Sequence, residues 1–530
     1  MAEVRWEDVL RKNPRERMKV EEHPLDVRRR LPALAAAGYE AVSEEDLVRL
    51  QWFGAYHDKP RVGYFMLRVK IPGGLLTPQQ CRAIGELAEQ FHDYAELTTR
   101  QNVQLHWVRL DDLGAVLDRL EALGLLPYGG CGDAVRNLTG CPLAGYHPDE
   151  PFDATDDLLA LARFFYDPAR RDYLNLPRKH KITVAACPDH CNYPEIHDIA
   201  FVGTVQDGEP GYAVWIGGGL STNPRLGRDL GVFVRREEAL EVARAILDVW
   251  REPPENRLSF TKARIKFFVD KIGPQEYRRR LETRLGRPLR DLREPPVPRQ
   301  RDFHDGSGPT RDGRCYQSFA LLGGVTSGRV LQRVAALAEA EGAAIRLSQR
   351  QNLILAGIAP ERLDAVRRQM AGLGFLTEGS LLRRASIACT SDPYCNYALN
   401  SSKQLLGALV ETLEARLGPL EDVVLAVDGC PHACAHHWVG DIGLQASYLR
   451  RADGSVEEAV MVILGGGYGR EAGIGRVVAR RVPVAEVADQ LVRLIAAYRR
   501  SGAPSFATFA RQESDEALVA IMEGTYAAAG

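Results

Sequence analysis

The pattern of hydrophobic and polar positions repeats itself in two distant parts of the chain. In each part, an apolar strand-like segment is followed by a helical pattern, a second strand-like segment and a second helical pattern. These elements are expected at about 61–74, 78–92, 98–110 and 111–123 in the first copy, and at about 317–325, 328–341, 345–357 and 360–373 in the second. Each copy predicts a β-α-β-α unit, so the chain is expected to be internally duplicated.

Local signals in the two copies agree with a duplication. The first helix is expected to begin with Thr77 as its N-cap, Pro78 at its first position and Gln80 as the partner in a capping box. The triplet Arg-Gln-Asn occurs at the same place in both copies, at 100–102 and at 350–352. The polar triplet, which both copies share, is more specific than periodicity alone.

The correspondence continues downstream of both units. Segment 184–203 parallels 426–445, and segment 214–231 parallels 462–478. Between the halves, residues 286–313 are rich in Pro, Gly and charge, which indicates a linker. Two homologous halves related by a pseudo-twofold axis would share a cleft at their interface, where a large cofactor could bind.

The composition narrows the class of protein. With 530 residues, of which 45% are hydrophobic and 26% charged, the chain is expected to form about three soluble domains. A formal net charge of −2 predicts no general attraction to nucleic acid or to an anionic membrane. The N-terminal segment is polar, and no apolar run approaches the ~20 residues that span a bilayer. We therefore expect a cytoplasmic protein whose ten cysteines are thiols and metal ligands rather than disulfides.

Four cysteines near the C-terminus form two pairs. Cys389 and Cys395 occur in ACTSDPYCN, and Cys430 and Cys434 occur in DGCPHACAHH. The Gly-Cys-Pro turn brings the second pair close together beside backbone N–H groups, which favour anionic sulfur ligands. Structural zinc sites mostly use gaps of about two to four residues in compact knuckles. The spacing therefore favours an iron–sulfur cluster over zinc.

Basic and polar side chains alternate along two strand-like segments. In LNLPRKHKITVAA, Lys179 and Lys181 would point to the same side of an extended strand, and Arg100 and Asn102 would do so in TTRQNVQLH. Such a row suits a small oxyanion or the carboxylates of a cofactor, whereas a solvated outer face is the alternative. Arg136 in DAVRNLTGCPLAG is a further candidate cation by its position.

Two glycine triplets each follow an apolar run. They consist of Gly217, Gly218 and Gly219 in the first half and Gly465, Gly466 and Gly467 in the second. Backbone amides at such positions can approach an anionic or flat ligand closely, and a tight turn is an equally good explanation. Neither triplet fits the dinucleotide-binding fingerprint. Composition and spacing thus predict a duplicated iron–sulfur protein with an inner cationic site, and they leave its substrate open.

Many short motifs follow one another in the order found in a known family. They are HPLDVRRRL, LQWFGAY, YFMLRVKIPGG, TTRQNVQLHW, VRNLTGCPLAG, NLPRKHK, IHDIAFVG, WIGGGLSTNP, ARIKFF, the paired cysteines, GCPHAC and GGGYG. In this order they resemble the sirohaem-containing, ferredoxin-dependent sulfite and nitrite reductases over nearly the whole chain. So many ordered matches exclude coincidence.

The resemblance implies the fold and the cofactors. It implies an α/β (α+β) protein in which two ferredoxin-like half-domains pair into one domain, with two larger α/β domains around a sirohaem and a [4Fe–4S] cluster. The implied cluster ligands are Cys389, Cys395, Cys430 and Cys434, and Cys434 would also bind the sirohaem iron. The expected boundaries are an N-terminal segment 1–52, half-domains 53–125 and 314–378, a linker 286–313, and sirohaem-binding halves 126–285 and 379–530, the latter with the cluster.

The resemblance also implies an activity and its site. The expected enzyme is an assimilatory, monomeric reductase that takes six electrons from reduced ferredoxin and passes them to a small oxyanion. Arg100, Arg136, Lys179 and Lys181 match the family's substrate-binding positions. The implied cofactor contacts are Asn102, Arg264, Lys266 and both glycine triplets.

Lys181 bears on the choice between sulfite and nitrite. Sulfite-reducing members tend to carry Lys-x-Lys at this place, whereas nitrite-reducing members tend to carry Asn at the second position. A dianion gains more from a second ammonium group than a monoanion does. The sequence therefore favours sulfite, although DAVRNLTGCPLAG resembles nitrite reductases at least as closely.

Two features extend beyond the common pattern. Tyr56 and Cys131 match positions that some members join by a thioether, and a pocket-lining tyrosine with a free thiol is the alternative. In the first half, Cys187 and Cys191, with Cys141 and His147 upstream, echo the cluster cysteines of the second half. They suggest either a second metal site or retained core thiols.

Other classes of protein share part of this pattern. A precorrin-3B synthase-like oxygenase would have a similar fold and cysteines, but LPRKHK and the chain length favour the reductase. An iron–sulfur electron carrier would need no cationic pocket. Because no flavin or nicotinamide motif is visible, a separate ferredoxin is the expected donor, and the basic runs 28–30 and 278–280 are candidate docking sites.

Overall fold

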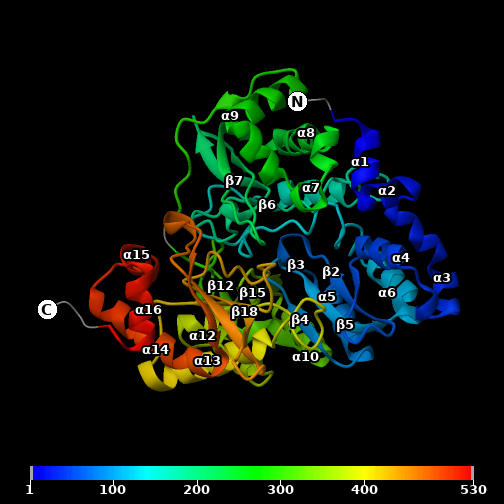
Figure 1. Cartoon of the computed structure of the whole chain (residues 1–530). Coiled ribbons are helices and arrows are strands. Elements are labelled where there is room, and N and C mark those ends of the chain that lie inside the picture. Colours follow the sequence, from blue (N-terminus) through cyan, green and yellow to red (C-terminus); the bar gives the residue numbers. More distant parts are fainter. Residues whose placement is uncertain (1–3, 300, 527–530) are drawn as a thin grey trace.

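The computed structural model describes residues 4–299 and 301–526. In this part of the chain the strands form four five-stranded sheets, which helices cover (Figure 1). The expected α/β (α+β) class and the internal duplication are confirmed. None of the described helices is both long and apolar enough to cross a membrane.

Short helices precede the first sheet, and Figure 1 shows them on the opposite side of the molecule from the C-terminal helices. They are α1 (Trp6–Lys12), α2 (Pro14–Glu21), α3 (Val27–Ala37) and α4 (Glu44–Leu50). Asn13 separates α1 from α2, and its side chain accepts a hydrogen bond from the backbone N–H of Arg15 at 3.1 Å. This cap satisfies a helix-end donor where the chain changes direction.

Each of the two β-α-β-α units contributes one edge strand to the sheet of the other. One sheet contains β1 (Ala55–His57), β2 (Tyr64–Val69), β5 (Val103–Arg109), β4 (Ala95–Leu97) and, from the second unit, β13 (Val325–Thr326). The other contains β11 (Ser307–Pro309), β12 (Cys315–Phe319), β15 (Leu353–Ile358), β14 (Ala344–Leu347) and, from the first unit, β3 (Leu75–Leu76). Each unit therefore completes the sheet of the other.

The helices of these units bury one continuous core. They are α5 (Pro78–Gln90), α6 (Leu110–Ala122), α10 (Gly328–Glu341) and α11 (Leu363–Ala371). α5 and α10 approach so closely that a Cβ atom added at Gly328 would lie 2.2 Å from the carbonyl oxygen of Gly85. Buried side chains of both units, such as Ile84 and Val334, belong to the same hydrophobic cluster. The two ferredoxin-like half-domains thus pair into one domain, as expected.

The other two sheets are both mixed; they have four strands with equivalent pairing, and each has one further edge strand of its own. The first-half sheet has the order β10 (Arg290–Asp291), β9 (Arg228–Arg235), β8 (Glu209–Ile216), β7 (Ile199–Gln206), β6 (Ile182–Ala185). The second-half sheet has the order β16 (Ile387–Ala388), β17 (Leu425–Asp428), β18 (Ile442–Arg450), β19 (Val456–Leu464), β20 (Arg476–Pro483). The covering helices are α7 (Thr155–Phe165), α8 (Ala239–Arg251) and α9 (Ile265–Leu285), and then α12 (Leu381–Ala385), α13 (Ser402–Leu417), α14 (Val484–Ser501), α15 (Phe506–Gln512) and α16 (Asp515–Glu523).

Strand register relates these two sheets residue by residue. β6 runs parallel to β7 with Ile182 opposite Ile199, and β17 runs parallel to β18 with Leu425 opposite Ile442. One constant offset in residue number matches both pairs of positions. The same offset pairs the loop after β6 with the loop after β17, which carries Cys430 and Cys434.

Three sequence-based expectations differ in detail from the structure. β5 begins only at Val103, and Gln101 has φ +54°, so Arg100 and Asn102 lie in a tight turn rather than on an extended strand. Lys179 and Lys181 likewise precede β6. The expected linker 286–313 contains β10 and β11, because its backbone pairs with the edges of two sheets.

Candidate functional site

The loops after β16 and β17 carry the four C-terminal cysteines. Cys389 directly follows β16, and the backbone N–H of Gly429, just after β17, donates to its sulfur at 3.2 Å. Because the strands are parallel neighbours, their carboxyl ends meet at one edge of the sheet. Cys395 follows Cys389 in the loop before α13, and Cys430 and Cys434 lie in the turn that leads to β18.

Asp428, at the end of β17, holds the loop that contains Cys430 and Cys434. Its carboxylate accepts hydrogen bonds from the backbone N–H of Ala435 at 2.8 Å and from the His437 ring at 2.8 Å. Both Asp428 and His437 are almost completely buried. This support was not predicted, although the Asp-Gly-Cys-Pro sequence carried the signal of an acid directly before a turn.

The four thiols are arranged for a cluster of several irons rather than for one ion. Burial, with the nearby Cys434 sulfur, raises the pKa of Cys430 to about 12, and burial also raises the pKa of Cys389 and Cys434. The thiols therefore lie close enough to affect one another, and thiolates in such a group need a cationic centre to neutralise them. The ligand atoms of a single metal ion all lie within about 4.8 Å of one another. Within the described residues, the four cysteine sulfur atoms do not form such a compact group. The donor set and its wider spacing fit a [4Fe–4S] cluster.

Cys434 lies deep in the protein and is nevertheless accessible. Its side chain is accessible, yet burial of its surroundings raises its thiol pKa. The Thr99 hydroxyl donates to the Cys434 carbonyl at 2.8 Å, which fixes the 98–102 turn against the cysteine loop. A thiol that is accessible but deep in the protein is suitably placed to contact a second cofactor.

Four cationic side chains lie close to one another near Cys434, and together they form what we call the cationic pocket: Arg100, Arg136, Lys179 and Lys181. Burial, reinforced by the charges of Arg136 and Arg264, lowers the pKa of Lys179 to about 7, and the Cys434 sulfur acts in the opposite direction. Burial, reinforced by Arg100, lowers the pKa of Lys181 well below its usual value. Burial also lowers the pKa of Arg100 to about 9. The structure thus brings Arg100, Arg136, Lys179 and Lys181, the candidate cations of the sequence analysis, close to one another and to Cys434.

These cations have no acidic partners of their own. Across residues 4–299 and 301–526, none of the four forms an ion pair with a carboxylate. Arg100 instead donates to the carbonyl of Asn137 at 2.5 Å and approaches His197 Nε2 at 2.8 Å. Burying a cation costs free energy unless an anion compensates its charge or the group loses its proton. The pocket therefore fits anionic ligands such as the carboxylates of a tetrapyrrole and a small oxyanion.

Arg68, on β2, was not predicted and belongs to this pocket. Its guanidinium donates to Cys131 Sγ at 2.5 Å and to Gln104 Oε1 at 2.7 Å, and it is close enough to Cys434 for their charges to interact. An arginine inside the otherwise apolar strand YFMLRV was the available sequence signal. Burial and the charge of Cys131 raise the pKa of Tyr56 to about 12, so Tyr56 and Cys131 are close enough for their charges to interact.

The predicted cofactor residues near the glycine triplets make mostly internal contacts. Arg264 forms an ion pair with Asp198 at 2.7 Å, and Asp198 also accepts from the backbone N–H of Lys181 at 2.7 Å. Lys266 donates to the carbonyl of Leu220 at 2.8 Å, which holds the first triplet's loop in place. Arg264 and Lys266 therefore shape the wall of the pocket.

Close backbone packing explains the glycines themselves. A Cβ atom at Gly218 would lie 2.5 Å from the carbonyl oxygens of Glu195 and His197, and one at Gly467 would lie 2.2 Å from that of Glu471. Gly217 and Gly465 both have φ +80°, which favours glycine. The two triplets thus occupy equivalent, tightly packed turns at the ends of β8 and β19.

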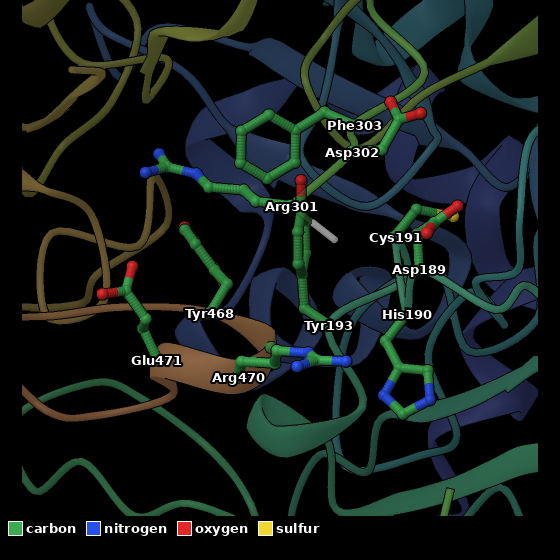
Figure 2. A pocket seen from close by; sticks show the side chains of 11 residues that line it. Asp189, His190, Cys191, Tyr193, Arg301, Asp302, Phe303, Tyr468, Arg470 and Glu471 are labelled. Atoms are coloured by element: carbon green, nitrogen blue, oxygen red, sulfur yellow. The ribbon is translucent and has the colours of Figure 1, made fainter. Parts of the chain in front are cut away.

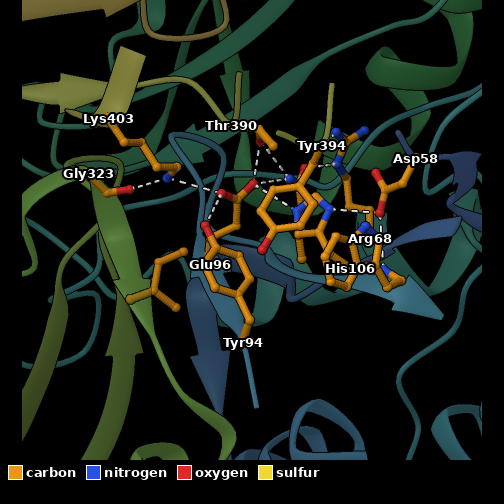
Figure 3. Close-up of polar contacts among 12 residues, drawn as sticks. Asp58, Arg68, Tyr94, Glu96, His106, Gly323, Thr390, Tyr394 and Lys403 are labelled. Atoms are coloured by element: carbon orange, nitrogen blue, oxygen red, sulfur yellow. Dashed lines mark hydrogen bonds and ion pairs between the residues drawn. The ribbon is translucent and has the colours of Figure 1, made fainter. Parts of the chain in front are cut away.

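A buried polar network fastens the Cys389–Cys395 loop to the first half (Figure 3). Glu96 on β4 lies at its centre, with Lys403 on one side at 3.0 Å and His106 on the other at 3.4 Å. Thr390, next to Cys389, donates to Glu96, and His106 contacts Asp58 at 2.9 Å. Because Thr390 and Lys403 belong to the second half, the cysteine loop depends on both halves.

Comparisons with known proteins agree with this geometry. The family model described as "Nitrite and sulphite reductase 4Fe-4S domain" matches residues 131–289. The model "Nitrite/Sulfite reductase ferredoxin-like half domain" matches residues 57–123 and 308–373. The chain is therefore similar to this family in both halves.

Individual relatives are similar over almost the whole chain. "Sulfite reductase [ferredoxin] 1" of Mycolicibacterium paratuberculosis is 32% identical over 96% of both chains. "Ferredoxin--nitrite reductase" of Synechococcus elongatus is 32% identical over 91% of this chain and 96% of that protein. The solved structure of Mycobacterium tuberculosis NirA superposes with a TM-score of 0.90, at 31% identity over 95% of this chain and 97% of the other.

Proposed function

The chain belongs to the nitrite and sulfite reductase family, with sirohaem and a [4Fe–4S] cluster as its cofactors, and we propose that it is an assimilatory, ferredoxin-dependent sulfite reductase. As a member of this family it is an oxidoreductase. When bound, the two cofactors supply the electrons for a six-electron reduction of one substrate atom. The side chains of this protein are left with two tasks, which are to hold the anion and to supply protons to it.

The proposed cofactor ligands follow from the cysteine loops. Cys389, Cys395, Cys430 and Cys434 would hold the cluster, and the accessible Cys434 thiol would also face the sirohaem. The domain boundaries expected from the sequence remain part of the proposal. They assign the sirohaem-binding halves to 126–285 and 379–530, and all four cysteines belong to the second of these ranges.

The cationic pocket is proposed to bind and protonate the oxyanion. Arg100, Arg136, Lys179 and Lys181 offer several N–H donors, and within residues 4–299 and 301–526 the nearby Asp198 carboxylate is paired with Arg264 instead, which suits an anion with three oxygens. Binding an anion beside Lys179 raises an ammonium pKa that burial holds near 7, so the lysine takes up a proton as the substrate binds. A lysine charged in this way can donate that proton to a substrate oxygen during reduction.

The observation that carries sulfite over nitrite is the second ammonium group. Burial and the charges of Arg100, Arg264 and Lys179 all lower the pKa of Lys181, so an anion at this position relieves an unfavourable group of cations. A dianion relieves it more than a monoanion does. Nitrite reduction is the second candidate, because a cyanobacterial protein named as a nitrite reductase is as similar as the proteins named as sulfite reductases.

Parallel kinetics test the proposal. The protein, loaded with both cofactors, would be assayed anaerobically with reduced ferredoxin, and sulfide and ammonia would be quantified from sulfite and nitrite reactions. We expect kcat/KM for sulfite to exceed that for nitrite at least about tenfold, as a difference of ~1.4 kcal/mol in transition-state binding requires. A clear excess for nitrite would reverse the substrate assignment. Turnover of neither anion would refute the reductase proposal itself.

The donor is proposed to be a reduced ferredoxin, by analogy with the printed names of the relatives. The basic runs suggested by the sequence give this proposal little support. Arg28 pairs with Asp118, Arg30 with Asp46, and Arg278 with Glu282. Arginines whose charge is already compensated attract an acidic partner weakly.

A further inference from the structure

Three cysteines of the first half and a histidine of the linker form a buried cluster. Cys141 lies in the loop before α7, Cys187 and Cys191 follow β6, and His304 lies just before β11. Their four donor atoms all lie within 4.8 Å of one another. His304 Nε2 is 3.4 Å from Cys141 Sγ and 3.3 Å from Cys187 Sγ. The reductase chemistry proposed above uses none of these side chains.

We propose that this Cys141 cluster (Cys141, Cys187, Cys191 and His304) binds one zinc ion in a tetrahedral site. Zinc–sulfur bonds of about 2.3 Å and zinc–nitrogen bonds of about 2.0–2.1 Å place tetrahedral ligands roughly 3.6 Å apart. The two sulfur–nitrogen distances are close to this value, so an ion fits after a small outward movement. Three thiolates and an imidazole at tetrahedral spacing favour zinc over harder divalent metals.

Internal symmetry explains why thiols occur here. The offset that relates β6 and β7 to β17 and β18 matches Cys187 with Cys430 and Cys191 with Cys434. The parallel bridge between Thr139 and Thr183 corresponds to the pairing of Ile387 with Ala426. Thr139 is therefore equivalent to Ile387. Two residues further along the chain, Cys141 is equivalent to Cys389. The Cys141 cluster is therefore the first-half counterpart of the iron–sulfur ligands.

The fourth ligand is where the two sites differ. The counterpart of Cys395 is His147, which lies against Asp189 at 3.5 Å and beside the His304 ring. His304 takes the fourth place in the compact group instead, and its backbone N–H donates to the Asp302 carboxylate at 2.7 Å, with its Nδ1 3.6 Å from the same oxygen. The Asp302 carboxylate thus lies near the ring nitrogen that does not face the cysteines, where metal-bound histidines commonly have a carboxylate. Closer spacing and a replaced thiol suit one ion rather than a second cluster.

The site has no place for a substrate. At most 3% of each of the four residues is exposed, and four protein ligands fill a tetrahedral shell. A cavity of about 190 Å³ lies beside it, lined by Cys191, Asp302 and Phe303 (Figure 2), but the ion itself would be closed off. The zinc is therefore structural, and it fastens the linker to the first half.

The zinc site would also fix the position of Phe303, the linker residue next to His304. Phe303, next to His304, stacks on the Arg350 guanidinium with 3.6 Å between the guanidinium carbon and the ring centroid. Arg350 is the second-half counterpart of Arg100 in the cationic pocket. The linker thus fills the position that mirrors the anion pocket, and the zinc site holds it there.

Metal analysis of the full-length, cofactor-loaded protein tests the proposal independently of the substrate assignment. We expect about one zinc per chain in addition to the cofactor iron, and zinc-edge X-ray absorption should show three sulfur ligands at about 2.3 Å and one nitrogen at about 2.0–2.1 Å. Absence of zinc from protein grown with zinc, or iron in the amount of a second cluster, would overturn it. Neither result depends on which anion is reduced.

Variants locate the ion. Cys187→Ser should lower zinc content at least about tenfold while sirohaem and cluster iron remain, because a lost thiolate weakens the whole shell. Cys315→Ser, a thiol outside the cluster, is the matched control and should keep its zinc. If Cys187→Ser fails to fold, His304→Cys provides the second test, since it should keep zinc and change the shell to four sulfurs. An unchanged shell in His304→Cys would refute the assignment.

Discussion

At the scale of single residues, the functional site depends on charges that the protein leaves uncompensated. Arg100, Lys179 and Lys181 are deep in the protein, and burial lowers the pKa of each. Nearby Arg264 differs, because Asp198 compensates its charge. This contrast separates residues proposed to contact ligands from residues that build the wall.

Lys181 should govern the preference for sulfite. Lys181→Asn removes one ammonium from the pocket, and a charged hydrogen bond is worth about 1.5–3 kcal/mol. We expect kcat/KM for sulfite to fall about 10- to 100-fold and that for nitrite to fall less, so that their ratio moves toward nitrite. Lys262→Asn, an exposed lysine, is the control and should change neither value. An unchanged ratio in Lys181→Asn would refute the role of the second ammonium.

His106 should make stability depend on pH. Burial alone lowers its pKa, but the ion pairs with Asp58 and Glu96 outweigh burial and raise the pKa to about 9. A raised folded-state pKa contributes stability that is complete below the unfolded value of about 6.5 and is lost as pH rises through about 9. The contribution is on the order of 3 kcal/mol.

The measurement is the apparent Tm of the holoprotein between pH 6 and pH 9.5. We expect Tm of the unaltered protein to fall across this interval and Tm of His106→Gln to fall much less. His23→Gln is the control, because burial lowers the pKa of His23, so this residue has no stabilising charge that a rise in pH would remove. Equal slopes for His106→Gln and the unaltered protein would contradict the assigned pKa.

At the scale of elements, close backbone contacts and exchanged strands join the two halves of the chain. α5 and α10 meet at Gly85 and Gly328, and the short strands β3 and β13 each complete the sheet of the other unit. The Glu96 network adds a polar connection between β4 and the cysteine loop. Local periodicity predicts the elements, whereas these approaches connect residues far apart in sequence.

Gly328 should tolerate no side chain. Gly328→Ala places a Cβ atom against the backbone of α5, and overpacking of this kind costs about 1–3 kcal/mol. Gly407→Ala in α13 is the matched control, because nothing lies within 4 Å of its added Cβ and alanine favours a helix by roughly 0.5–1 kcal/mol. Denaturant unfolding should therefore show opposite shifts for the two variants. Stabilisation by Gly328→Ala would show that the helices are less tightly packed.

At the scale of the whole molecule, two similar halves perform different tasks. The second half carries the four cysteines proposed to hold the cluster, and the first half carries Lys179 and Lys181 of the cationic pocket. The linker breaks the symmetry, because Phe303 lies on Arg350 at the position that mirrors Arg100. The same duplicated framework thus accounts for both proposed sites, the cofactor site of the second half and the zinc site of the first.

The sequence by itself determined the class of fold, the duplication, the family and most of the chemical groups of the site. These follow from local patterns, since strand and helix periodicity, cysteine spacing and ordered motifs depend on neighbouring residues. Only the tertiary structure decided that a tight turn presents Arg100, that Arg68 and Asp428 support the pocket and the cysteine loop, and that His304 rather than His147 joins the first-half cysteines. Those arrangements depend on which distant segments pack together, and the linker's path is set by burial and pairing over the whole chain.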